Sequence, residues 1–180
     1  IQQFISKPKW CLDMLKAKRL NFGNIMGHVN NVTNLSSLAS WTADQFDPTL
    51  TWKDIGWIRD RWQGKLILKG IMDKDDAKFA VNAGADAIIV SNHGGRQLDG
   101  APSTISVLSE ISEEVKNKTE VHFDGGIRSG QDVLKALSLG AKCTYVGRPY
   151  VYGLGAKGQE GVELALDIIY KELDLTMAMC

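Results

Sequence analysis

From residue 66 onward the chain alternates short apolar runs with segments of helical character, and this alternation constrains the fold more than any other feature. The apolar runs cover 65–69, 87–91, 120–124 and 143–147. They read as apolar rather than alternating, which is typical of parallel strands covered on both faces. The expected helices cover 73–82, 105–116, 130–139 and 161–173. Asp73 and Ser129 are candidate N-caps, so the pattern predicts four successive β/α units.

A weak internal repeat supports this interpretation. The segment Ala-Gly-Ala-Asp at 83–86 precedes one predicted strand, and Leu-Gly-Ala-Lys at 139–142 precedes the strand two units later. Four repeated β/α units favour half of an eight-stranded barrel over a doubly wound sheet. A complete barrel takes roughly 250 residues, whereas this chain has 180.

The first 62 residues differ in character from the rest. A helix is expected over 4–20, and 52–62 predicts a second helix that packs toward the first strand. Between them, 21–51 is rich in Gly, Asn, Ser and Thr and has no clear period. A stretch of that length is interpreted as an active-site lid or a mobile connection.

Composition excludes several classes of function. Lys and Arg number 21, as do Asp and Glu, so the zero net charge gives no sign of a nucleic-acid partner. No run approaches the 18 apolar residues that predict a transmembrane helix. Cys11, Cys143 and Cys180 have no paired spacing, so we expect no disulfide framework, no metal site and a reducing cytosol. Ile1 is not an initiator methionine, and the opening residues resemble neither a signal nor a transit peptide.

Charged or hydrogen-bonding residues stand at the carboxyl end of every predicted strand, where β/α barrels carry their chemistry. In chain order they are Lys69; Ser91, His93 and Arg96; Asp124, Gly125, Gly126 and Arg128; and Gly147 and Arg148. We therefore expect one site along this edge of the sheet.

The last two strand ends predict an anion site. Gly125 and Gly126 allow backbone N–H groups to approach a ligand, and the helix after Ser129 offers its positive end. Gly147 and Arg148 add a second close approach and a fixed cation. The alternative is that these glycines serve turns and the arginines are solvated. No P-loop is present, because the glycines are not followed by a Lys-Ser/Thr pair.

The second strand end predicts acid–base chemistry. His93 is suited to take a proton near neutral pH, and Arg96 offers a planar fork to a carboxylate. The alternative for His93 is a polar surface residue. Lys69 could neutralise charge that develops on a cofactor, or it could extend into solvent. Of the other histidines, His122 is expected to pack in the strand wall, and His28 has no visible partner.

Four motifs together resemble the FMN-dependent α-hydroxy-acid oxidoreductases, which include glycolate oxidase, mandelate dehydrogenase, flavocytochrome b2 and bacterial L-lactate dehydrogenases. They are Lys-Gly-Ile at 69–71, Ser-Asn-His-Gly-Gly-Arg-Gln-Leu-Asp at 91–99, Asp-Gly-Gly-Ile-Arg at 124–128 and Gly-Arg-Pro at 147–149. Phe-Asp-Pro at 46–48 and Leu-Thr-Met-Ala-Met at 175–179 extend the match. The resemblance implies the C-terminal half, strands 5 to 8, of a TIM (β/α)8 barrel, with 1–62 and 63–180 as parts of one domain.

The resemblance also implies roles. His93 is expected to be the general base and Arg96 the ligand of the substrate carboxylate. The FMN ligands are then Lys69, Ser91, Asp124, Gly125, Gly126, Arg128, Gly147 and Arg148. The implied reaction oxidises an L-2-hydroxy acid, with L-lactate preferred, in a parent protein that supplies the first half of the barrel.

The expected partners and location follow from the same resemblance. We expect a cytoplasmic homo-oligomer, with peripheral attachment to the inner membrane left open. The alternative function is a non-catalytic half-barrel that binds phosphate or FMN and self-associates through its open sheet edges. A phosphosugar isomerase barrel shares the phosphate loops but gives no reason for the His-Gly-Gly-Arg cluster.

Overall fold

The computed structural model describes residues 2–16, 25, 28–29, 32 and 35–180, which form two compact units, 1–50 and 51–180. The first unit holds α1 (Gln2–Ile5), α2 (Pro8–Lys16) and α3 (Leu35–Asp44). The single helix expected from residue 4 is therefore wrong at its start, because Pro8 opens a new helix at the position that needs no N–H donor. Residues 17–20, its expected end, lie outside the described part.

Helix α3 corrects the expectation for 21–51, which predicted no regular structure. Leu38 of this helix is buried, and the Thr42 hydroxyl donates to the Leu38 carbonyl. Ser and Thr have a helix propensity only moderately below that of the best helix formers, so their abundance hid the helix.

The second unit contains a parallel sheet of four strands in the order β1-β2-β3-β4. The strands are β1 (Ile67–Ile71), β2 (Ala87–Val90), β3 (Glu120–Phe123) and β4 (Cys143–Thr144). The predicted strands and their parallel order are confirmed. β1 begins later than expected because Leu66 exchanges hydrogen bonds with Asp86. β4 is shorter than expected because the chain turns from the sheet after Tyr145.

Helices alternate with these strands. They are α4 (Trp52–Arg61), α5 (Lys74–Asn82), α6 (Thr104–Glu114), α7 (Gly130–Ser138), α8 (Arg148–Lys157) and α9 (Gln159–Met179). Asp73 caps α5 by accepting from the Asp75 N–H, and Ser129 forms a capping box with Asp132 at α7, as the sequence predicts. Helix α8 is an addition that the sequence did not predict.

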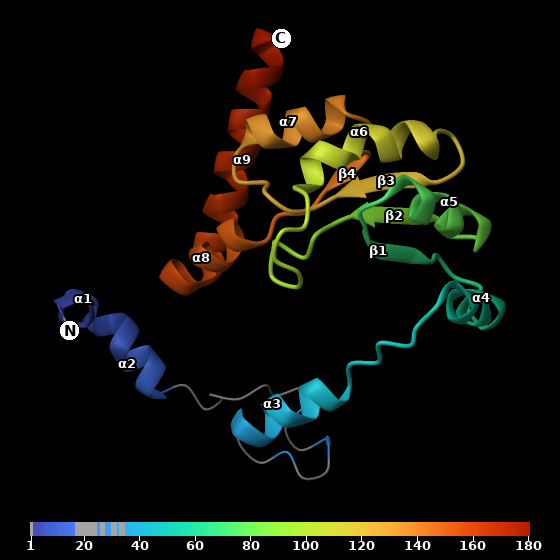
Figure 1. Cartoon of the computed structure of the whole chain (residues 1–180). Helices are drawn as coiled ribbons and strands as arrows, with labels where there is room; N and C mark the ends of the chain where they lie inside the picture. Colours follow the sequence, from blue (N-terminus) through green and yellow to red (C-terminus); the bar gives the residue numbers. More distant parts are fainter. Residues whose placement is uncertain (1, 17–24, 26–27, 30–31, 33–34) are drawn as a thin grey trace. The chain divides into compact units, whose positions relative to one another are not determined.

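The hydrophobic core lies between the sheet and helices α5, α6 and α7, which follow one face of the strands (Figure 1). Ile88, Val90 and Phe123 point into this core from the strands, and Leu108 and Ile111 meet them from α6. On the opposite face of the sheet, Ile67 is 44% exposed. On the same face of β2, Ala87 and Ile89 are only 4% and 8% exposed, so the expected covering on both faces holds for β2 but not for Ile67 of the edge strand β1.

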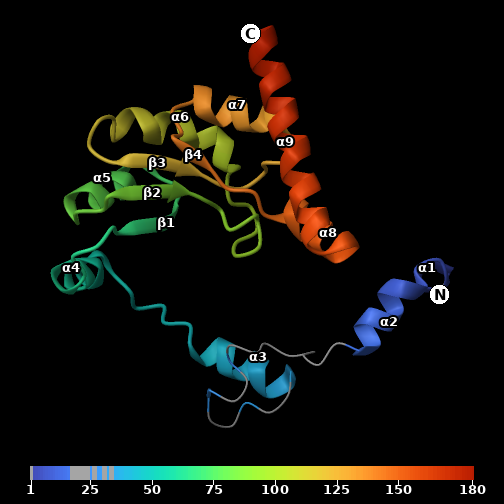
Figure 2. The same cartoon turned by 180° about the vertical axis from the view of Figure 1, so that it is seen from behind.

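Helices α8 and α9 pack closely together, and α9 also packs against α7 (Figure 2). The backbones of Gly153 and Gly161 touch, and a Cβ on either glycine would overlap the carbonyl of the other. Gly130 at the start of α7 meets the α9 backbone in the same way. None of the helices in the described part of the chain is long and apolar enough to cross a membrane.

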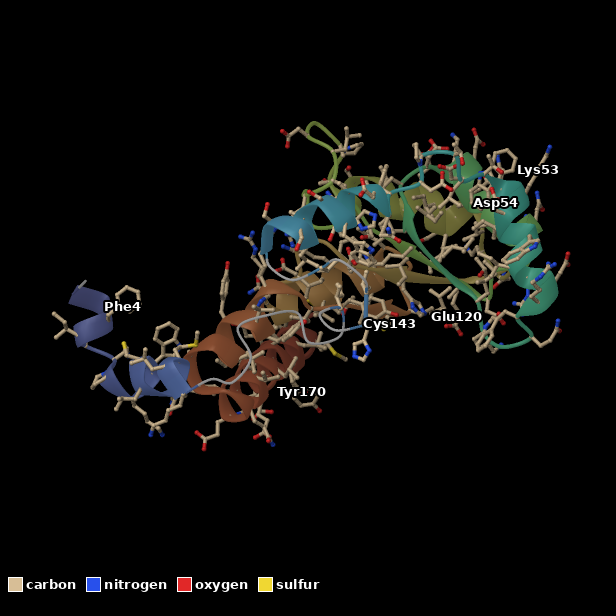
Figure 3. The ribbon with its side chains drawn as sticks, turned by 90° about the horizontal axis from the view of Figure 1, so that it is seen from below. Phe4, Lys53, Asp54, Glu120, Cys143 and Tyr170 are labelled. Carbon is tan, nitrogen blue, oxygen red and sulfur yellow. The ribbon has the colours of Figure 1, made fainter. Side chains whose placement is uncertain are left out.

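An ion-pair cluster joins the amino-terminal ends of β1 and β2. Asp86 accepts from the Lys65 Nζ at 2.7 Å, from the Leu66 N–H at 2.9 Å and from Arg59 of α4 at 3.3 Å. These bonds, led by the one from Lys65, lower the pKa of the Asp86 carboxyl to about 2. At the start of α4, Asp54 (Figure 3) accepts from Thr51, which lowers its pKa as well.

Candidate active site

An open cleft of about 810 Å³ lies at the carboxyl ends of the strands. Of the predicted site residues, all but Ser91 line it. Parallel strands bring their carboxyl ends to one edge of a sheet, so residues distant in sequence meet there. The volume falls within the range of ligand and cofactor sites.

Ser91 lies beneath the cleft and connects three of its residues. The Lys69 ammonium donates to Ser91 Oγ at 2.7 Å, the His93 backbone N–H donates to the same oxygen at 3.1 Å, and Ser91 Oγ–H donates to Asp124 Oδ1 at 2.6 Å. A hydroxyl has one proton and two lone pairs, so all its hydrogen-bonding capacity is used. Because Ser91 is only 1% exposed, it supports the cleft from behind.

Lys69 is held in a defined place rather than extended into solvent. Its Nζ forms an ion pair with Asp124 Oδ2 at 2.7 Å in addition to its bond with Ser91. The Asp124 side chain is 17% exposed and that of Lys69 is 43% exposed. An ammonium has three protons, so one remains for a ligand in the cleft.

The loop that carries His93 has a strained backbone. His93 has a φ of 55°, and Gly94 and Gly95 each have a φ of 71°. Asn92 stabilises this turn, because its Oδ1 accepts from the Gly95 N–H and its Nδ2 donates to the Pro102 carbonyl. A bulky residue at positive φ is uncommon and clusters at functional sites.

The His93 side chain is exposed to the cleft and lies against the backbone of β1. A β-bulge between Lys69 and Ile71 lets Gly70 take a φ of 104° directly beside the imidazole. A Cβ on Gly70 would lie 3.1 Å from His93 Nε2. A side chain at residue 70 would therefore push the ring away from its present position.

Three guanidinium groups line the cleft. Arg148 donates to the Gly94 carbonyl at 2.7 Å, which ties the His93 loop to the start of α8. Arg96 and Arg128 form no side-chain ion pair with any residue in the described part of the chain. The cleft therefore holds unneutralised positive charge that suits carboxylate and phosphate groups.

The expectation that α7 offers its positive end to an anion is wrong. Asp132 of the capping box accepts from the backbone N–H groups of Arg128 and Ser129, each at 3.0 Å. The next N–H, that of Gly130, donates to Glu172 of α9 at 2.9 Å. The Ser129 hydroxyl accepts from the Asp132 N–H, so the N–H groups of 128–130 and 132 are already occupied at this helix end.

The free helix N-terminus that the sequence predicted at α7 is instead found at α8. Its N-cap is Gly147, which supplies no side-chain hydrogen bond, and its first residues Arg148 and Pro149 line the cleft. A short helix with a free N-terminus beside the last strand is a recurrent phosphate site in barrels. Pro149 near its start is the signal that sequence reasoning missed.

Tyr145 also lines the cleft and was not predicted. Its hydroxyl lies 2.9 Å from Nδ1 of His122, which is buried in the strand wall as expected. Glu120, labelled in Figure 3 beside Cys143, lies 3.2 Å from the other ring nitrogen of His122. Burial raises the pKa of the Tyr145 phenol, so it stays protonated at neutral pH. Its position two residues before Gly147, at the end of the last predicted strand, is the signal that could have identified Tyr145 as a residue of the cleft.

Comparison with known proteins agrees with this geometry. The whole chain, 1–180, matches the family described as FMN-dependent dehydrogenase. It is 46% identical to an L-lactate dehydrogenase of Vibrio cholerae serotype O1 (strain M66-2), covering 99% of this chain and 48% of that protein. Among solved structures, mandelate oxidase with benzoyl-formic acid gives a TM-score of 0.71 at 48% identity, covering 75% of this chain and 40% of that one. The monotopic membrane protein (S)-mandelate dehydrogenase gives 0.85 at 36% identity, covering 95% and 45%.

The chain spans about half the length of these relatives. Its four parallel β/α units therefore correspond to half of a TIM barrel. The family motifs, the relatives and the geometry at the strand ends agree, and the chain belongs to the FMN-dependent dehydrogenase family.

Proposed function

We propose that the parent protein oxidises an L-2-hydroxy acid, with L-lactate as the preferred substrate, to the 2-oxo acid. The observation that carries this proposal is the presence in one cleft of the exposed His93 imidazole and the unpaired Arg96 guanidinium. The relatives named L-lactate dehydrogenase support the choice of substrate. Benzoyl-formic acid, named with mandelate oxidase, is itself a 2-oxo acid and supports the reaction class.

The cleft residues fit the FMN that the family uses. Gly126 has open space on its Cα, and the start of α8 has a free helix end, so backbone N–H groups can meet a phosphate there. Arg128 adds a cation without a partner among the described side chains. Lys69 keeps one proton free for an electron-rich edge of the ring system. When bound, FMN supplies the acceptor for the two electrons that the substrate loses.

The remaining chemistry belongs to side chains of this chain. Arg96 binds the carboxylate through its planar fork and orients the substrate. His93 accepts the proton that the substrate loses on oxidation, at the ring nitrogen that faces the cleft. Ser91 accepts from the His93 backbone N–H, and Gly70 leaves room for the imidazole beside β1, so the position of His93 is set within this chain.

The first half of the barrel is the partner that we propose for this chain. In the described sheet, β1 and β4 each have a neighbouring strand on one side only. Unpaired edges must be covered or paired, and a second set of four strands would close them. Self-association of two half-barrels would relieve the same edges and remains the competing proposal. The proposed location is the cytoplasm, with surface attachment to the inner membrane as the alternative that the monotopic relative supports.

A base-deletion experiment tests the reaction. The full-length parent, loaded with FMN, is mixed anaerobically with L-lactate, and bleaching of the flavin absorbance is followed. We expect His93→Ala to retain FMN but to bleach about 10²–10⁴-fold more slowly, the usual contribution of a general base. Gln97→Ala is the matched control, because Gln97 lines the same cleft without a titrating group.

Each outcome has a separate meaning. An unchanged bleaching rate in His93→Ala refutes the assignment of the base. An FMN-loaded wild-type protein that no 2-hydroxy acid bleaches refutes the reaction. Size-exclusion chromatography of the 180-residue chain, alone and with the first half added, decides between the two partners. A stable dimer of the chain alone that does not bind the added half favours self-association.

A further inference from the structure

The peptide between Gly125 and Gly126 is held from behind by a buried hydroxyl that none of the site motifs contains. Thr104, the first residue of α6, donates its Oγ1 proton to the Gly125 carbonyl at 2.8 Å. The Thr104 residue is only 1% exposed. Its hydroxyl is therefore a fixed internal anchor rather than a surface group.

This bond sets the direction of the next backbone donor. In a planar trans peptide the C=O and N–H bonds point in opposite directions. Because the Gly125 carbonyl points toward Thr104, the Gly126 N–H points away from it. Gly126 lines the cleft and has no atom within 4 Å of the position a Cβ would take.

The packing around Gly125 shows that this arrangement is tightly determined. A Cβ on Gly125 would lie 2.8 Å from Thr104 Oγ1 and 3.1 Å from Asn92 Oδ1. Asn92 in turn bonds to Pro102, two residues before Thr104. The segment 102–104, which leads into α6, therefore holds both the loop of the proposed base and the loop of the proposed phosphate cradle.

We propose that Thr104 is a positioning residue for FMN: its hydroxyl locks the Gly125 peptide so that the Gly126 N–H faces the ligand phosphate or its ribityl oxygens. This inference rests on the proposed function, because it assigns a task to the cradle proposed there. Loss of the hydroxyl leaves the Gly125 carbonyl without this donor and frees the peptide to rotate toward another one.

The test measures FMN affinity in the full-length apoprotein by quenching of flavin fluorescence. We expect Thr104→Val, which keeps the shape and removes the donor, to weaken FMN binding roughly tenfold. Thr104→Ser restores the donor and should bind FMN as the wild type does. Thr104→Ala serves in the same role if the valine variant does not fold.

Thr119→Val is the matched control. Thr119 Oγ1 donates to the Ala85 carbonyl at 2.9 Å, the same kind of bond at the opposite ends of the strands. Both valine variants should lose similar stability to urea, but only Thr104→Val should lose FMN affinity. Equal loss of affinity in the two variants, or wild-type affinity in Thr104→Val, would overturn the proposal.

A second readout does not depend on FMN. In the ¹⁵N-labelled apoprotein, Thr104→Val should shift the Gly126 amide resonance and change its exchange rate, whereas Thr119→Val should not. An unchanged Gly126 amide refutes the role of Thr104. A wild-type protein that binds no FMN refutes the proposed function instead, and the amide measurement still decides whether Thr104 orients this peptide.

Discussion

Substitution of Gly70 by alanine should damage catalysis more than it damages the fold. Gly70 lies at the bulge of β1 with a φ of 104°, and its Cα faces the imidazole of His93. The added methyl carbon would lie 3.1 Å from His93 Nε2. That nitrogen is part of the proposed base, so the substitution perturbs the reacting atom directly.

The size of the effect follows from this contact. Comfortable separation between such atoms is roughly 3.5–4.0 Å, so the ring must move by about half an ångström. Misplacement of a reacting group by about 1 Å costs on the order of 10²-fold in rate, so a displacement of about 0.5 Å predicts a loss in kcat of about tenfold. Backbone strain at positive φ adds a separate loss in unfolding free energy of about 1–3 kcal/mol.

Gly100→Ala separates these two effects. Gly100 has a φ of 77° and no atom within 4 Å of its missing Cβ, so alanine brings strain there without a new contact. Urea unfolding should show similar destabilisation of both variants. Anaerobic bleaching of FMN by L-lactate in the full-length parent should be slow only in Gly70→Ala. Equal kcat values in the two variants would show that Gly70 does not position His93.

Three further predictions concern stability and are read from urea unfolding. Asp86→Asn should destabilise the protein at neutral pH. Because the folded-state pKa of the Asp86 carboxyl, about 2, lies below the ordinary 3.8, the difference in stability from wild type is complete above about pH 4 and disappears as the pH falls toward 2. A difference that stays constant with pH would refute the ion-pair origin. Ser129→Ala removes the cap that receives the Asp132 N–H and should cost about 1 kcal/mol, whereas no loss would show that the capping box is dispensable. Gly161→Ala places a methyl group against the Gly153 carbonyl and should cost about 1–3 kcal/mol; wild-type stability would mean that α8 and α9 can separate freely.

The fold was predictable because its signals are local and repeated. Apolar runs bounded by glycines and N-caps identified the strands and the helices between them, and the parallel order followed from the β/α alternation. The site was predictable for the same reason, since parallel strands align their carboxyl ends. His93 and Arg96 share one loop and Arg128 lies more than 30 residues later, but each follows a strand closely enough to reach one cleft.

What sequence reasoning missed depends on contacts between distant residues. Nothing near Ser129 indicates that Glu172, far along the chain, satisfies the N–H of Gly130 and removes the anion site expected at α7. The burial of Ser91 beneath the cleft likewise depends on hydrogen bonds to Lys69 of β1 and to Asp124, which directly follows β3. Helix α8 carries glycines at 153 and 155 that lower helix propensity, and packing against α9 offsets that cost.

These contacts have a consequence for how the two halves of the parent protein divide the work. The bonds that orient His93, Lys69 and the Gly125 peptide all join residues within 51–180. The proposed base and the proposed phosphate cradle are therefore supported by bonds within this unit, and none of these bonds involves the proposed first half of the barrel. The proposed first half would supply the rest of the enclosure, because the described cleft is open. Docking would then strengthen the charge interactions of Arg96 and Lys69 by excluding water rather than by moving them, since opposite charges interact more strongly in a lower dielectric.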